Sequence, residues 1–258
     1  MVVRYSRADH VAFLTLDNAP TNVIDHAWLD AFEAALDSAE RDDRVKVLVV
    51  RSAQQRFFCG GADVNILHRS SADENLRFVR RVQETFDRLE SAAMLCVAVI
   101  EGHATGGGYE LALACDIRMA AAGTYRIGLP EAVLGLLPAG GGTQRLQRLV
   151  GTGRALSLMC TGKLVGPAEA TRLGLVDLLA ESSDIATELD TLTRPLATIP
   201  AEALAAIKRC VIGGQGQALA AGLEIEAREI YALFHSDETR SRISAFVSQG
   251  GAAGKAGK

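Results

Sequence analysis

Cysteine is scarce in this 258-residue sequence, and the arrangement of the few cysteines excludes two kinds of cross-linked protein. A disulfide framework or a structural zinc site needs cysteines that are paired or clustered. The five present are odd in number, widely spaced and without a Cys-x-x-Cys pair: Cys59, Cys96, Cys115, Cys160 and Cys210. The pattern predicts no disulfide framework and no metal site, and it favours a reduced, cytoplasmic compartment.

Long hydrophobic runs are also absent. Arg4, Arg7 and Asp9 interrupt the N-terminal region, so it lacks the apolar stretch of a secretory signal. No apolar segment elsewhere reaches the roughly 20 residues that a membrane-spanning helix needs. We therefore expect no membrane span.

An excess of positive charge is missing as well. The formal net charge is −4 and the pI is near 5.8, whereas a nucleic-acid-binding domain usually presents a basic surface. Four arginines share one face of a predicted helix, but acidic residues interleave with them: Arg77, Arg80, Arg81 and Arg88. We interpret this face as solvated and expect no nucleic-acid partner.

Several common catalytic motifs do not occur. There is no Gly-x-Gly-x-x-Gly after a strand, no Gly-Lys-Ser/Thr after the glycine-rich loop, no Gly-x-Ser-x-Gly and no His-Glu-x-x-His. These absences argue against a dinucleotide-binding fold, a P-loop nucleotide site, an α/β-hydrolase and a zinc protease.

What is present is an alternation of strand-like and helix-like segments. Strands are predicted at 2–5, 11–16, 45–51, 97–100 and 117–121. Helices are predicted from an Asp25 cap to residue 39, from an Asp73 cap to residue 90, and at 109–115 and 143–150. From residue 185 onward only helices are predicted, at 185–197, 201–211, 218–234 and 238–247.

The centre of the chain places carboxylates beside exposed glycine backbone. The strand at 97–100 leads to three consecutive glycines at 106–108 and then to a helix that carries Glu110. Consecutive glycines let a ligand approach the backbone, and an outward-pointing amide at a helix start can stabilise an oxyanion. Glu131 follows 21 residues later in another apolar run. Apolar surroundings raise the pKa of a glutamate toward neutrality, where it can move protons.

Each of these features also has a structural explanation. Three glycines can mark a close contact between a helix and a strand. Glu110 and Glu131 can be ordinary carboxylates at helix starts, where the helix dipole favours negative charge. From this stretch alone both interpretations stay open.

Five segments change that balance because they occur together and in order. They are Phe58-Cys59-Gly60-Gly61-Ala62-Asp63, the run from Glu101 to Ala112 with its three glycines and Glu110, Gly128-Leu129-Pro130-Glu131, the run from Pro138 to Leu146, and Thr161-Gly162 with residues 168–176. In this order they resemble the motifs of the enoyl-CoA hydratase/isomerase (crotonase) superfamily. The resemblance covers roughly residues 10 to 250.

The resemblance implies an α/β fold of the crotonase type. Residues 1–195 would form a spiral of ββα turns that holds the active site. Residues 196–258 would form the helical trimerisation region, with a Gly/Ala/Lys tail from residue 250 that we expect to be disordered. We accordingly expect a homotrimer, or a hexamer made of two trimers.

The resemblance also implies the chemistry. The substrate would be an acyl-CoA thioester that carries coenzyme A itself, so no separate cofactor is expected. By motif position, the amides of Ala62 and Gly107 hold the thioester oxygen and stabilise its enolate-like charge. Glu110 activates the water that adds at the beta carbon, and Glu131 positions that water and protonates the alpha carbon. Further substrate contacts are expected at Gly61, Asp63, Gly106, Pro130, Pro138 and Gly141.

These implications predict an enoyl-CoA hydratase of fatty acid β-oxidation. The family's hydratases carry both glutamates, whereas its double-bond isomerases often keep only the second. The alternatives within enzymes are an isomerase or a hydratase of a specialised acyl chain. A different class is an acyl-CoA-binding, scaffold or RNA-binding protein of the same fold, against which the acidic pI and the carboxylate pair argue.

Overall fold

The computed structural model of this protein describes residues 2–253, with side chains through residue 248. The chain divides into two compact units that meet at residues 197 and 198. This boundary lies two residues beyond the predicted one, between 195 and 196. The separate roles assigned to the two parts stay a prediction.

The first unit is built on two sheets whose strands alternate along the chain. The larger sheet has the order β1-β2-β3-β5-β7-β9, made of β1 (Val3–Ala8), β2 (Val11–Leu16), β3 (Val47–Ser52), β5 (Leu95–Ile100), β7 (Ile117–Ala121) and β9 (Leu178–Ala180). The smaller sheet has the order β4-β6-β8, made of β4 (Phe57–Cys59), β6 (His103–Thr105) and β8 (Ile127–Gly128). Strands β1 and β2, both predicted, form an antiparallel hairpin, and the other pairings between these strands are parallel.

Three times in succession the chain passes from the larger sheet to the smaller one and then into helix: after β3–β4, after β5–β6 and after β7–β8. The helical elements of this unit are α1 (His26–Glu40), α2 (Val64–Arg69), α3 (Ala72–Ser91), α4 (Gly107–Leu113), the 3-10 turn η1 (Glu131–Leu134), α5 (Gly142–Val150), α6 (Thr152–Thr161), α7 (Pro167–Leu173) and α8 (Ile185–Thr193), and a further turn, η2 (Arg194–Thr198), follows α8. The repetition is the predicted spiral of ββα turns, and the structure confirms it.

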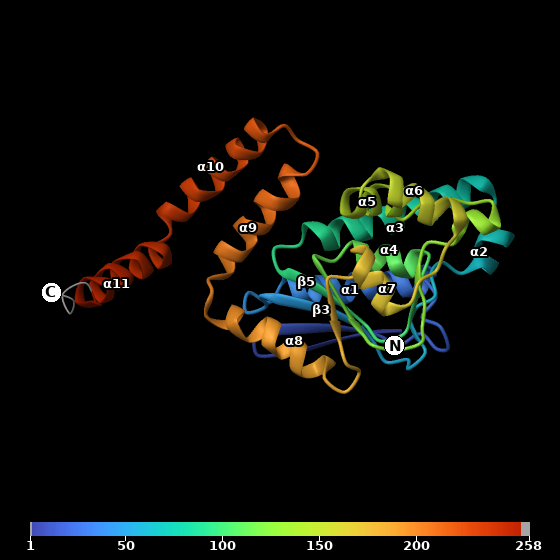
Figure 1. The fold of residues 1–258 in the computed structure, drawn as a ribbon, viewed down its shortest axis with the longest axis horizontal. Helices are drawn as coiled ribbons and strands as arrows, with labels where there is room; N and C mark the ends of the chain where they lie inside the picture. The colour runs from blue at the N-terminus through green and yellow to red at the C-terminus, as the bar shows by residue number, and fades with distance from the viewer. Residues whose placement is uncertain (1, 254–258) are drawn as a thin grey trace. The chain divides into compact units, whose positions relative to one another are not determined.

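Both faces of the larger sheet are buried, as parallel strands require. Successive side chains of a strand point to opposite faces, so Leu48 and Val50 of β3 enter the core that contains α1, and Val47 and Val49 enter a second cluster that contains α8. Figure 1 shows α3 and α4 on one side of these strands and α8 on the other. Apolar burial on both faces therefore holds the spiral together.

The helix caps follow local sequence signals, and one predicted cap is wrong. Asp25 caps α1 as predicted, by accepting the N–H of Trp28 at 2.7 Å. The cap of α3 is Ser71 and not Asp73, which lies in the first turn. Ser71 Oγ accepts the Glu74 N–H at 3.3 Å while the Glu74 carboxylate accepts the Ser71 N–H at 2.8 Å. This reciprocal capping box satisfies two amides at once, which a lone aspartate cannot do.

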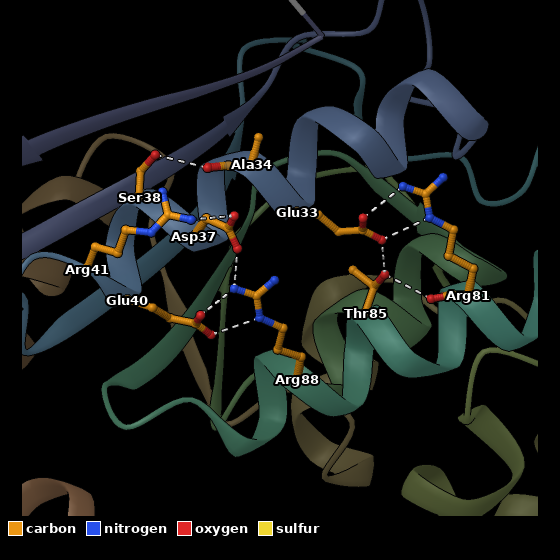
Figure 2. A network of polar contacts seen from close by, with 9 residues as sticks. All are labelled: Glu33, Ala34, Asp37, Ser38, Glu40, Arg41, Arg81, Thr85 and Arg88. Carbon is orange, nitrogen blue, oxygen red and sulfur yellow. Dashed lines mark hydrogen bonds and ion pairs between the residues drawn. The ribbon is translucent and has the colours of Figure 1, made fainter.

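Helix α3 is tied to α1 by two arginines, as Figure 2 shows. Arg81 donates to both carboxylate oxygens of Glu33, at 3.1 and 2.8 Å, and Arg88 donates to Glu40 at 3.1 Å. These two side chains pair with carboxylates of α1 and remain partly exposed, so the interpretation of a solvated face holds for them only in part. The other two arginines of that face are exposed.

The second unit is helical as predicted, with α9 (Ala201–Gly214), α10 (Leu219–His235) and α11 (Asp237–Ala253). Arg209 of α9 pairs with Glu229 of α10 at 2.6 Å. Large apolar side chains of this unit are exposed, among them Leu219, Tyr231, Phe234, Ile243, Phe246 and Val247. Within residues 2–253, no helix combines the length and the apolar character needed to cross a membrane.

The predicted disorder of the tail from residue 250 stays a prediction. Residues 250–253 are the last four residues of α11. The remainder of the predicted tail, residues 254–258, lies outside the described residues.

The capping box generates a stability prediction. Replacing Ser71 by Ala removes a side-chain acceptor from α3, so we expect the free energy of unfolding to fall by about 1 kcal/mol. Urea unfolding followed by circular dichroism measures this change. Ser71→Asn, which keeps a capping oxygen, should stay near the wild-type value. An alanine variant as stable as wild type would show that the box contributes nothing.

Candidate active site

Three loops leave the smaller sheet at one edge. Its strands run parallel, with Cys59 opposite Ala104 and Thr105 opposite Gly128. Because the carboxyl ends of parallel strands meet at the same edge, the segments that follow them lie together. These segments are residues 60–63, 106–108 and 129–131. They contain most of the predicted site residues.

The first loop turns beside the start of α4. Gly61 has a φ of +94°, a backbone region that favours glycine, and a β-carbon there would lie 3.1 Å from the nitrogen of Gly107. The backbone of Ile24 bridges this loop by donating to the Gly61 carbonyl at 2.8 Å and accepting the Asp63 N–H at 3.0 Å. The Ala62 N–H lies between these two bonds and takes part in neither.

The second loop brings another backbone amide to the same place. Gly106, with a φ of +57°, is the N-cap of α4, so Gly107 is the first helical residue and no carbonyl lies one turn before it to accept its N–H. A β-carbon on Gly107 would lie 3.4 Å from the nitrogen of Ala62. The amides of Ala62 and Gly107 are therefore close neighbours, an arrangement that can bind an anionic oxygen.

Glu110 lies on the first turn of α4 and is 4% exposed. Its Oε1 accepts the N–H of Gly142 at 2.7 Å, and a β-carbon on Gly140 would lie 2.8 Å from its Oε2. Burial raises the pKa of this carboxyl, while the amides of Gly142 and Gly140 and the charge of Arg145 act in the opposite direction. The carboxyl group is thus enclosed by the loop that precedes α5.

Glu131 begins η1, directly after the third strand of the smaller sheet. Its Oε1 packs against Gly106, because a β-carbon on that glycine would lie 2.8 Å from the Oε1 of Glu131. Its Oε2 is buried and has no hydrogen-bond partner among the described residues. Burial, together with the negative charge of Glu110, raises the pKa of Glu131 to about 7. The group can therefore hold or release a proton near neutral pH.

The other predicted contacts lie on the same loops. Pro130 is the N-cap of η1, and Gly141, with a φ of +108°, is the N-cap of α5. The Cβ of Pro138 comes within 2.8 Å of where a β-carbon on Gly142 would be. The carboxylate of Asp63 caps α2 by accepting a backbone N–H at 2.9 Å. Contacts between these residues and a substrate stay a prediction.

Three residues of the site escape the sequence analysis. Gly142 donates to Glu110, and the side chains of Arg145 and Gln83 bind carbonyls of the same loop, at Gly140 and Ala139. Gly142 and Arg145 belong to the motif from Pro138 to Leu146, but the motif alone does not say what they contact. Gln83 lies in the middle of α3 and has no sequence signal.

The arrangement combines two neighbouring amides with two carboxyl groups whose pKa values are raised by burial. Such a site can stabilise negative charge on an oxygen and transfer protons beside it. Throughout residues 2–253 there is no group of three or more His, Cys, Asp or Glu side chains placed to hold a metal ion.

Comparison with known proteins points to one family. A profile of the enoyl-CoA hydratase/isomerase family matches residues 6–253. A probable enoyl-CoA hydratase of Bacillus subtilis (strain 168) is 33% identical over 241 residues, 93% of each chain. The fatty acid oxidation complex subunit alpha of Shewanella amazonensis is 41% identical over 175 residues, which are 66% of this chain and 25% of that protein.

Solved structures agree with this result. An enoyl-CoA hydratase from Geobacillus kaustophilus HTA426 superposes with a TM-score of 0.92 and 33% identity, over 96% of this chain and 94% of that one. The resemblance seen in the sequence and the predicted crotonase-type fold are both confirmed.

The raised pKa of Glu131 generates a prediction about stability and pH. The folded state holds the proton up to a pH of about 7, whereas the unfolded chain releases it near 4.5. The folded state therefore binds more protons between these values, and the free energy of unfolding falls as the pH rises through this window. The full destabilisation is present above the folded pKa.

Glu131→Gln removes the destabilising charge of the ionised carboxylate. We therefore expect the free energy of unfolding of this variant to exceed that of wild type by about 2 kcal/mol at pH 8, a figure reduced for partial exposure, and by much less at pH 5. Urea unfolding at the two pH values measures the difference. Glu181→Gln, at an exposed position, is the matched control and should change little. A difference at residue 131 that does not grow with pH would contradict the assigned pKa.

Proposed function

This chain belongs to the enoyl-CoA hydratase/isomerase family, and we propose that it is an enoyl-CoA hydratase. It adds water in the syn sense to a 2-trans-enoyl-CoA thioester and gives a 3-hydroxyacyl-CoA. The observation that carries this proposal is the presence of two carboxyl groups, one buried and one half-buried, beside two neighbouring backbone amides.

The amides of Ala62 and Gly107 bind the thioester oxygen. Water addition to the beta carbon pushes electron density onto this oxygen, which becomes enolate-like. Donors that are already oriented toward it stabilise the charge without reorganising, and losing one such donor typically slows a reaction by about 100- to 1,000-fold. The positive φ of Gly61 supports this role, since it brings the two amides together.

The two glutamates divide the proton transfers. Glu110 takes a proton from water while the oxygen of that water bonds to the beta carbon. Glu131 orients the same water and delivers its own proton to the alpha carbon as the enolate collapses. Glu110 then releases a proton and Glu131 regains one, so the net reaction adds one water. A pKa of about 7 suits Glu131 to this role, because the group is partly protonated at neutral pH.

The second unit supports a proposal about assembly and setting. Its exposed apolar side chains on α10 and α11 are of the kind that protein interfaces cover. We therefore propose a homotrimer, or a hexamer of two trimers, that works in the cytoplasm on acyl-CoA thioesters of fatty acid β-oxidation. Size-exclusion chromatography with light scattering measures the subunit number.

Turnover of crotonyl-CoA tests the proposed activity, followed by the loss of absorbance of the conjugated enoyl thioester. We expect Glu110→Gln and Glu131→Gln each to lower kcat by about 100- to 10,000-fold, because each variant removes one proton-transfer group. Both should still bind the thioester. Glu181→Gln serves as the matched control and should retain wild-type kcat.

Other outcomes separate the alternatives. Full turnover by Glu131→Gln would disprove the role given to that residue. A wild-type protein that leaves crotonyl-CoA unchanged but shifts the double bond of a 3-enoyl thioester would be an isomerase. Tight binding of coenzyme A thioesters without any conversion would indicate a binding protein of the same fold.

A further inference from the structure

The loop at residues 138–142 rests on helix α3. Gln83 of α3 donates from Nε2 to the carbonyl of Ala139 at 2.7 Å. A β-carbon on Gly140 would lie 3.2 Å from Cγ1 of Val82, so the loop touches α3 closely at this point. The loop therefore takes its position from a long helix and does not depend on its own glycines alone.

Arg145 is the second support of this loop. Its Nη1 donates to the carbonyl of Gly140 at 3.1 Å, and its Nη2 donates to Asp87 at 2.5 Å and to Glu90 at 2.9 Å. Both carboxylates belong to α3. The arginine is 8% exposed, and a charge so deeply buried needs this kind of pairing. The guanidinium thus joins the loop to α3.

The guanidinium also fills the space directly beneath the loop. A β-carbon on Gly141 would lie 2.1 Å from Nη1 of Arg145. The φ of +108° at Gly141 also favours glycine. A residue with a side chain at position 141 would therefore collide with the guanidinium. Displacing the guanidinium would remove the hydrogen bond to the Gly140 carbonyl and the packing contact with Gly141.

Glu110 contacts the same loop. Gly142, two residues after the carbonyl that Arg145 binds, donates its N–H to Glu110 at 2.7 Å. Gly140 itself packs against the carboxyl, since a β-carbon there would lie 2.8 Å from Oε2. A shift of the loop would therefore move the hydrogen-bond donor of Glu110.

We propose that Arg145 is a positioning residue for Glu110. Held by Asp87 and Glu90, it binds the carbonyl of Gly140 and so fixes the loop whose Gly142 amide orients the Glu110 carboxylate. The effect on rate rests on the proposed function, in which Glu110 is the base, whereas the effect on the carboxyl group does not.

The charges near Glu110 determine in which direction its pKa should change when Arg145 is replaced. Arg145 on α5 supplies the charge that lowers the pKa of Glu110, whereas the charge of Glu110 itself raises the pKa of Glu131 on η1. Arg145 and the Gly142 amide both favour the ionised form of Glu110, so loss of the arginine should raise the pKa of that carboxyl. Since a base works only when ionised, the acidic limb of the kcat–pH profile should move to higher pH.

The experiment compares Arg145→Gln and Arg145→Lys with wild type in crotonyl-CoA hydration. We expect Arg145→Gln to lower kcat on the order of 100-fold, the scale for a displaced catalytic group, with little change in KM and with the shifted acidic limb. Arg145→Lys keeps the charge but loses the forked contacts, so it should recover part of kcat. Arg88→Gln, which removes another ion-paired arginine, is the matched control and should behave as wild type.

Two further measurements keep the test decisive. Asp87→Asn acts on a side chain that is 69% exposed, so it should fold even if Arg145→Gln does not, and it should shift the acidic limb in the same direction by less. Infrared titration of the carboxyl band that disappears in Glu110→Gln reports the protonation of Glu110 without any turnover.

The outcomes separate the two proposals. If wild type does not hydrate crotonyl-CoA, the proposed function fails, and the infrared titration alone decides the role of Arg145. An unchanged Glu110 titration in the arginine variants, or in Asp87→Asn if those do not fold, would overturn the positioning role. A lower kcat with an unshifted pH profile would do the same, because it would indicate a purely structural effect.

Discussion

The parallel pairing of β4, β6 and β8 is the constraint on which the site depends. Three short strands, each reached by a separate turn of the spiral, end at one edge and deliver three loops to one place. The hydrogen bond from the Gly106 N–H to the carbonyl of Gly128, at 2.9 Å, joins the second loop to the last residue of β8, after which the third loop begins. Parallel strands need long crossovers, so residues as distant in sequence as Ala62, Gly107 and Glu131 become neighbours only when the spiral is complete.

Burial then makes the two carboxyl groups different from each other. Glu110 is almost fully shielded from water and Glu131 is shielded in part, which raises both pKa values. The hydrogen bond from the Gly142 amide partly offsets the loss of hydration of the Glu110 carboxylate. Oε2 of Glu131 has no hydrogen-bond partner in the described part of the chain, and the negative charge of Glu110 raises the pKa of Glu131 further. Two carboxyl groups in unlike surroundings are suited to unlike proton-transfer roles. The cost in stability at high pH belongs to the same arrangement that supports the proposed chemistry.

Helix α3 serves two parts of the molecule. Arg81 and Arg88 tie it to α1, and Gln83, together with the carboxylates that hold Arg145, supports the loop next to Glu110. Side chains three or four residues apart share one helix face, and a 20-residue helix has room for both sets of contacts. The stability of the spiral and the geometry of the site are therefore linked through one element.

The alternation of strands and helices, the helical second unit and the motifs that resemble the family could be predicted from the sequence, because they depend on local periodicity, on glycine and on residue order. The spiral came from the resemblance, since periodicity alone does not show which strands pair. The folded molecule was needed to show that Ser71 caps α3, that α11 continues to residue 253, and that Gly142 and Arg145 hold the loop beside Glu110. The physical reason is distance along the chain: Gly142 lies 32 residues from Glu110 and Arg145 lies 58 from Asp87, and burial, charge and hydrogen bonding act between residues that only folding brings together.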